Sequence, residues 1–124
     1  MKDSFDELAR CRTFIEAALE YSQGTHEFID IAAGVLSNRY QLWAGKKSAV
    51  VTEIIVYPRL KDLHYFLAGG DLDELKSMRP HIEEWGAKHG CTRVTLAGRP
   101  GWARTFLRDE GYAPTWSILK KDLL

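Results

Sequence analysis

The chain has 124 residues, 45% of them apolar and 27% charged, and 17 basic side chains balance 17 acidic ones. This length and composition suit one globular domain, residues 1–124, and exclude an intrinsically disordered protein. Balanced charge removes the simplest argument for a nucleic-acid or membrane partner, and no apolar run approaches the roughly 20 residues that span a bilayer. The first residues lack the apolar centre of a secretion signal, so we expect a cytosolic protein that is not secreted.

Cysteine and histidine spacing argues against a metal centre. Cys11 and Cys91 lie far apart in the sequence with no second ligand pair nearby, which indicates reduced thiols. The four histidines show neither metal-ligand spacing nor a local carboxylate partner. The sequence therefore predicts no metal site and no disulfide.

The first third of the chain has two helical patterns. From Ser4 to about Tyr21, apolar residues recur every three or four positions, which predicts a helix with one buried face. Residues 22–24 break this pattern, and Thr25 is the predicted N-cap of a second helix. The apolar stripe of that helix runs from Phe28 to Leu36, and Ser37-Asn38 is expected to end it.

A period of two then replaces the helical period. Tyr40–Ala44 and Ser48–Tyr57 are rich in aromatic and β-branched residues, and Gly45-Lys46-Lys47 between them is typical of a hairpin turn. A third strand is predicted over Leu63–Ala68. The connection of residues 59–62 is so short that the three strands should form an antiparallel meander.

A long helix follows the meander. Asp71 and Glu74 have the spacing of a capping box in front of a helical apolar series that should run to about His89. Pro80 lies inside this series, removes one backbone donor, and should kink the helix or divide it at Arg79.

Three shorter elements complete the pattern. We expect a strand over Thr92–Ala97, a helix over Pro100–Asp109 that Gly111 ends, and a last strand over Thr115–Lys121. The order is ααβββαβαβ. This is an α/β chain of the α+β type, in which an antiparallel meander is followed by helix-strand-helix-strand in one mixed sheet.

This order, together with a local motif, resembles the GNAT family of N-acetyltransferases. In the segment GRPGWARTFLRDEGY, the residues Ala103, Phe106, Gly111 and Tyr112 match a pattern that commonly reads Asn-x-x-Ala-x-x-Phe-Tyr-x-x-x-Gly-Phe in that family. The resemblance implies a GNAT-like mixed sheet, and acetyl-CoA as the cofactor of an active member.

The cofactor loop departs from the family pattern. GNAT enzymes hold the pyrophosphate of acetyl-CoA on backbone amides of a basic, glycine-containing loop before the central helix, where helix amides attract anions. The equivalent residues here are Ala68, Gly69, Gly70, Asp71 and Leu72. No basic residue precedes these glycines, and Asp71, Asp73 and Glu74 place three carboxylates in the first helical turn. We therefore expect a turn, a helix cap and no cofactor; if acetyl-CoA does bind, these loop residues with Arg99 and Arg104 are its implied contacts.

The catalytic positions are also incomplete. When Gly111 is aligned with the family's glycine, the common catalytic tyrosine falls on Leu107, which cannot protonate a thiolate. Tyr65 is a nearby tyrosine that could replace it in space. Glu53 and His64 on the meander are the candidate general bases, and Glu53 would need a raised pKa to serve. The alternative is that Glu53 is a solvent-facing strand residue.

A basic surface is a further candidate site. Arg93, Arg99, Arg104 and Arg108, with Trp102, lie in the last predicted strand and helix, and Arg104 and Arg108 have i, i+4 spacing. This side could hold a phosphate or an acidic partner, or be a solvated helix face.

A second function class comes from a wider resemblance. The segments YQLWAG, VTEIIVYPR, FLAGGDLDEL, GCTRVTLAGRPGW and GYAPTW are similar to small GNAT-like proteins encoded among the virion and assembly genes of tailed bacteriophages. This implies a catalytically silent virion component or assembly factor in the host cytoplasm and the particle, with phage structural or assembly proteins as partners and a homo-oligomer left open. The alternative is an acetyl-CoA-dependent N-acetyltransferase with a divergent donor loop. An enzyme needs an open groove between the Leu63 and Thr92 strands, and a structural protein needs a surface that a partner buries.

Overall fold

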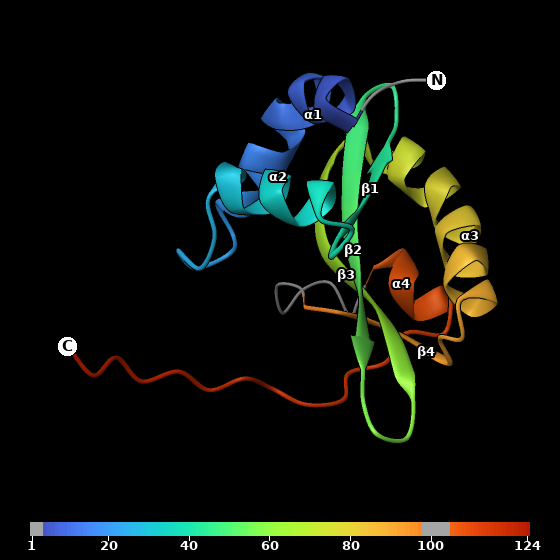
Figure 1. Ribbon diagram of the computed structural model, residues 1–124. Helices are drawn as coiled ribbons and strands as arrows, with labels where there is room; N and C mark the ends of the chain where they lie inside the picture. Colours follow the sequence, from blue (N-terminus) through green and yellow to red (C-terminus); the bar gives the residue numbers. More distant parts are fainter. Residues whose placement is uncertain (1–3, 98–104) are drawn as a thin grey trace.

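The computed structural model describes residues 4–97 and 105–124. Its elements are α1 (Ser4–Leu19), α2 (Phe28–Leu36), β1 (Gln41–Ala44), β2 (Ser48–Val56), β3 (Lys61–Gly70), α3 (Leu72–Lys88), β4 (Arg93–Leu96) and α4 (Phe106–Asp109). The sheet has the order β1-β2-β3-β4, with β1, β2 and β3 antiparallel and β4 parallel to β3. The predicted meander and mixed α/β arrangement are confirmed (Figure 1).

Helices cover both faces of the sheet: α1 and α2 lie on one face and α3 on the other (Figure 1). The core under α1 and α2 contains the buried side chains Leu8, Cys11, Ile15, Ile31, Val35, Val51 and Leu67. The core under α3 contains Val50, Leu63, Tyr65 and Ile82. Successive residues of a strand point to opposite faces, so Val50 and Val51 of β2 contribute to different cores.

The N-cap of α2 differs from the prediction. Glu27 is the cap, and its backbone N–H donates to Asp30 Oδ2 at 2.8 Å. The Thr25 hydroxyl instead donates to the Ser22 carbonyl at 2.9 Å. Threonine is a strong N-cap residue and glutamate is not, but the Asp30 carboxylate three residues after Glu27 accepts the Glu27 backbone N–H and completes the cap.

The long helix α3 is continuous. Asp71 caps it as predicted, because its side chain accepts the Glu74 backbone N–H at 2.9 Å. The helix passes through Pro80 to Lys88, so of the two expected outcomes, a kink or a division at Arg79, the division does not occur. Buried Ile82 packs in the sheet core beyond the proline, and this packing offsets the hydrogen bond that proline removes.

The last part of the chain departs most from expectation. Residues 113–124 form no strand and run away from the sheet (Figure 1). The strand predicted over Thr115–Lys121 is therefore wrong for the single chain, and the observed order is ααβββαβα. Residues 115–121 do alternate in the way a strand does, but a strand also needs a neighbouring strand for its backbone hydrogen bonds. The helix predicted over Pro100–Asp109 is seen as Phe106–Asp109, and residues 98–104 lie outside the described part.

Candidate functional site

The strands β3 and β4 pair over only part of their length. Asp62–Tyr65 lie beside Arg93–Leu96, and β3 then continues from Phe66 to Gly70 with no partner on that edge among the described residues. A cavity of about 310 Å³ lies where the two strands part, beneath α3 and α4. The cavity lies between the two strands where the acetyltransferase alternative requires an open groove.

The cavity is mainly apolar. Its apolar lining residues are Val50, Phe66, Leu67, Ala68, Leu72, Leu75, Leu96, Ala97 and Leu107. Three lining residues carry polar groups, namely Tyr65, Arg79 and Thr105. A cavity with these walls suits an aliphatic group better than a polar one.

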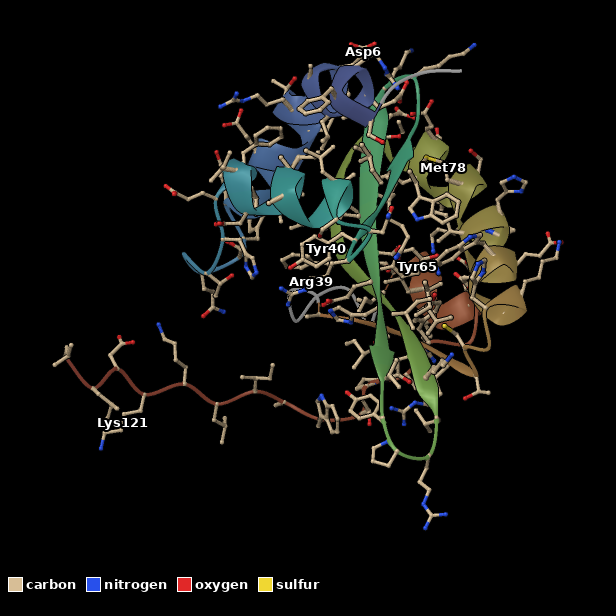
Figure 2. The ribbon with its side chains drawn as sticks, viewed as in Figure 1. Asp6, Arg39, Tyr40, Tyr65, Met78 and Lys121 are labelled. Carbon is tan, nitrogen blue, oxygen red and sulfur yellow. The ribbon has the colours of Figure 1, made fainter. Side chains whose placement is uncertain are left out.

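A buried arginine joins four side chains at the cavity wall. Arg79 on α3 is 6% exposed, and its Nη1 lies 2.7 Å from Glu110 Oε2. Its Nη2 lies 3.4 Å from Glu83 Oε2. The same Glu83 oxygen accepts the hydroxyls of Tyr65 at 3.0 Å and Tyr112 at 2.9 Å. These five residues, here called the Arg79 cluster, tie β3, α3 and the turn after α4 together, and Figure 2 shows Tyr65 inside the fold, close to α4.

The Arg79 cluster holds both tyrosines in the neutral form. Burial raises the pKa of Tyr65, and the negative charge of Glu83 raises it further. Burial and the hydrogen bond to Glu83 likewise raise the pKa of Tyr112. The Arg79 guanidinium carbon lies 5.8 Å from the centre of the Tyr65 ring and 4.8 Å from that of Tyr112. A tyrosine with a raised pKa is a weaker acid, and each hydroxyl already has an acceptor.

Leu107 takes the place where the family resemblance puts the catalytic tyrosine. Leu107 lies on α4, is 3% exposed and lines the cavity. The position aligned with the family's tyrosine therefore lies in the cavity wall, but the leucine side chain there cannot donate a proton. Tyr65 also lines the cavity, and its hydroxyl donates a hydrogen bond to Glu83.

Glu53 lies on the other face of the sheet. It is the register partner of His64, whose neighbours Leu63 and Tyr65 point into the α3 core. Because side chains alternate along a strand, His64 and Glu53 point to the opposite face. His64 Nδ1 is 2.9 Å from Thr95 Oγ1, and burial lowers the pKa of His64 although Glu53 acts against this shift. Among the described residues, those that line the cavity do not include Glu53.

The two loop glycines accommodate close contacts within the chain. A Cβ atom on Gly69 would collide with the carbonyl oxygen of Phe14 in α1. Gly70 has a φ of +114°, and a Cβ there would collide with the carbonyl oxygen of Lys47 in the β1–β2 turn. Of the predicted loop residues, Ala68 and Leu72 line the cavity.

The first turn of α3 is negatively charged and internally bonded. The Glu74 carboxylate accepts the backbone N–H groups of Lys46 at 3.1 Å and Lys47 at 2.8 Å, and also the Ser48 hydroxyl. The hydrogen bonds from Ser48 and Lys47 lower the pKa of Glu74, so it is ionised. With the Asp71 cap and Asp73 beside it, this turn does not fit the pyrophosphate of acetyl-CoA.

Arg93 is committed to a structural ion pair. Its Nε and Nη2 lie 2.7 and 2.8 Å from the two carboxylate oxygens of Asp62, which is 2% exposed. This bidentate bond lowers the pKa of Asp62 and joins the starts of β3 and β4. Of the other residues in the predicted basic surface, Arg108 is exposed, and Arg99, Trp102 and Arg104 lie outside the described residues.

Sequence reasoning missed the Arg79 cluster. The i, i+4 spacing of Arg79 and Glu83 on α3 was a usable signal for an ion pair. No sequence signal connects this pair with Glu110 or Tyr65, because the fold brings them together.

Cys11 and Cys91 are free thiols, as predicted. Within residues 4–97 and 105–124, no group of three His, Cys, Asp or Glu side chains is placed to hold a metal ion. Over the same ranges, no helix is both long enough and apolar enough to cross a membrane.

Solved structures share this architecture. No family model and no curated protein matches the sequence. The structure of "a possible acetyltransferase from Clostridium difficile 630" superimposes with a TM-score of 0.69 at 11% identity, over 99% of this chain and 95% of that one. An aminoglycoside acetyltransferase from an uncultured soil metagenomic sample, in complex with sisomicin, gives 0.69 at 10% identity over 96% and 89%. The fold is that of the GNAT-type acetyltransferases.

A eukaryotic protein shares the GNAT fold as well. An acetyltransferase of Trypanosoma brucei gives a TM-score of 0.68 at 12% identity, over 98% of this chain and 96% of that one. At such identities the likeness establishes the GNAT fold alone, and one fold can host unrelated functions. The function must therefore be argued from the cavity and its side chains.

Proposed function

We propose that this chain is a GNAT-fold protein without acetyltransferase activity that acts through protein contacts in the assembly or the particle of a tailed bacteriophage. The observation that carries the proposal is that Leu107 lines the cavity, at the position where the family resemblance puts the catalytic acid. A thiolate leaving group needs a proton donor, and Tyr65, the tyrosine in the cavity lining, already donates a hydrogen bond to Glu83.

The α3 N-terminus supports the same conclusion. CoA carries a pyrophosphate, and the N-cap carboxylate of Asp71 with the two first-turn carboxylates of Asp73 and Glu74 repel such a group. The absence of a side chain at Gly69 lets the loop approach α1, and its absence at Gly70 lets the loop approach the β1–β2 turn. The loop therefore has reasons for its sequence that do not involve a cofactor.

The surface supports a role in protein contacts. Beyond Tyr112 the chain exposes large apolar side chains, among them Trp116, Ile118 and Leu119. Exposed apolar groups that lie close together in a segment are typical of interaction surfaces. The phage context within the proposal rests on the resemblance of the sequence segments quoted above.

A thiol-release assay tests the absence of activity. With acetyl-CoA and a panel of primary amines, we expect CoA release at the uncatalysed rate. Ala68→Phe fills the cavity, and Ala87→Phe is a matched control on the exposed side of α3. The proposal would be refuted by CoA release above the uncatalysed rate that Ala68→Phe abolishes and Ala87→Phe preserves.

The phage assignment has its own test. Particles and proheads of a phage that encodes this chain can be purified and analysed by mass spectrometry. We expect peptides of this chain in at least one of them, and their absence from both would contradict the assignment.

The second candidate is an acetyl-CoA-dependent N-acetyltransferase, and the cavity between β3 and β4 is the observation that favours it. In that case the apolar walls would take the acyl end, with Tyr65 as the candidate catalytic group in the cavity wall, and a general base other than Glu53 would be needed because Glu53 lies on the opposite face of the sheet. The pyrophosphate would need a site other than the α3 first turn. This candidate predicts that Leu107→Tyr raises CoA release above that of the unsubstituted chain, whereas the first proposal predicts no change.

A further inference from the structure

The segment after α4, residues 113–124, exposes several large apolar side chains to solvent. Trp116, Ile118, Leu119 and Leu123 are each between 74% and 94% exposed. The segment holds no regular structure and extends away from the body (Figure 1). It is here called the tail, and such a run of exposed apolar groups indicates a contact that the single chain does not make.

The start of the tail is fixed to the body. The backbone N–H of Tyr112 donates to the Leu107 carbonyl at 3.0 Å, and its hydroxyl donates to Glu83. Pro114 follows at once, and a residue before proline favours an extended backbone, which applies to Ala113. The tail therefore leaves from a held point in an extended form, and Figure 2 shows Lys121 far from the helices and the sheet.

The tail has the pattern of a strand. Alternate residues share a face, so Trp116 and Ile118 lie on one face and Thr115, Ser117 and Leu119 on the other. Aromatic and β-branched residues favour strands. What the tail lacks is a hydrogen-bonding partner.

The strand β4 offers such a partner. Among the described residues, β4 pairs only with β3 and forms one edge of the sheet. Thr92 N–H donates inward to the Lys61 carbonyl at 3.0 Å. Because backbone groups alternate in direction along a strand, Arg93 and Thr95 present theirs to the outer edge.

The side chains at this edge also match the tail. Val94 and Leu96 of β4 are half-buried and pack against the α3 core. An added strand would continue this apolar row with Trp116 and Ile118, and Trp116 alone offers on the order of 150–250 Å² of surface.

We propose that residues 115–121 of one copy add as a strand to the β4 edge of a second copy, and that the two copies exchange tails. One chain supplies both the donor strand and the receiving edge, so a two-fold exchange satisfies both copies at once. The exchange does not depend on any chemistry in the cavity and goes beyond the proposed function.

Light scattering coupled to size exclusion tests the exchange on the full chain. We expect a molar mass of twice 14.1 kDa. Ile118→Lys should give a monomer, and the matched control Asp122→Lys, a polar tail position, should stay dimeric. Ile118 is exposed, so the substitution should leave the far-ultraviolet circular dichroism unchanged. A monomer at millimolar concentration, or a dimer that survives Ile118→Lys, overturns the proposal.

Cross-linking separates exchange from folding back onto the same chain. Two differently tagged chains, one with Thr95→Cys and one with Ser117→Cys, are mixed in a Cys91→Ser background and treated with a short bismaleimide, because Thr95 and Ser117 both lie on the face opposite the apolar row of Val94 and Leu96. We expect a linked pair carrying both tags. A link that forms only when both substitutions are in one chain, at monomer mass, would show that the tail pairs with its own β4 and overturns the proposal.

Discussion

The hydroxyls of Tyr65 and Tyr112 donate to the same atom, Oε2 of Glu83, at 3.0 and 2.9 Å. One tyrosine comes from β3 and the other from the turn after α4, so a single carboxylate on α3 connects the two sides of the cavity. Both hydroxyls are thereby engaged in hydrogen bonds within the fold. The account predicts stability effects for these groups and no catalytic ones.

Alkaline pH should weaken the fold through these tyrosines. Burial and Glu83 raise the pKa of both above the ordinary value of about 10. A group with a raised folded-state pKa stabilises the fold fully below its unfolded pKa and loses that contribution as pH rises above it. The free energy of unfolding, measured by urea denaturation, should therefore fall above about pH 10.

The control for this effect is Glu83→Gln. Without the negative charge, the pKa of each tyrosine should shift downward, and ultraviolet titration should show their ionisation at lower pH. The matched substitution Glu84→Gln, at an exposed neighbour that pairs with Lys88, should leave the titration unchanged. Identical titration curves for Glu83→Gln and the unsubstituted chain would contradict the assignment.

Arg79→Met should lower stability at neutral pH. The substitution leaves Glu83 and Glu110 without their cation, and we expect a loss of about 2–3 kcal/mol, below the full cost of a stranded buried charge because both carboxylates are partly exposed. Lys88→Met on the same helix removes an exposed pair and should cost less than about 0.5 kcal/mol. Equal midpoints of urea denaturation for the two variants would count against a structural role of the Arg79 cluster.

Asp62→Asn should lower stability at neutral pH and not in acid. Arg93 lowers the pKa of Asp62, so this carboxylate stabilises the fold above its unfolded pKa of about 3.9 and loses that contribution as pH falls through the lower folded value. We expect a deficit of about 1.5–3 kcal/mol at pH 7, typical of hydrogen bonds to charged groups. Thermal melts should show the gap closing at acid pH, and a gap independent of pH would be the contrary result.

Gly69→Ala should destabilise the chain in the absence of any ligand. The new Cβ would meet the Phe14 carbonyl oxygen, a backbone atom that cannot move without shifting α1, and overpacking of this kind costs about 1–3 kcal/mol. Gly24→Ala is the comparison, because nothing lies within 4 Å of a Cβ there and only its positive φ of 76° resists the change, at about 1 kcal/mol. A Gly69→Ala chain as stable as the original would remove the packing explanation for this glycine.

Most of the fold could be predicted because its signals are local. Helical spacing gave α1 and α2, alternation gave the meander, and the Asp71–Glu74 spacing gave the start of α3. The tail shows where such reasoning ends: Thr115–Lys121 alternates like a strand, but pairing depends on an edge that no local pattern reveals.

The candidate site could be predicted only in part. The motif match singled out Leu107, which the structure places in the cavity wall, and the unsuitability of the loop for a pyrophosphate stays a prediction from the carboxylates after Gly70. The Arg79 cluster could not be predicted, because Tyr65, Glu83 and Tyr112 are distant in sequence and meet only through packing of α3 on β3. Glu53 looked accessible to the site, but strand alternation places it on the other face of the sheet.

The most direct test of the central claim is acetyl-CoA binding by isothermal titration calorimetry at low and moderate salt. The account predicts no binding at millimolar acetyl-CoA, because the first turn of α3 repels the pyrophosphate. Binding with one site per chain that Ala68→Phe abolishes and Ala87→Phe preserves would contradict the account and assign the cavity to acetyl-CoA.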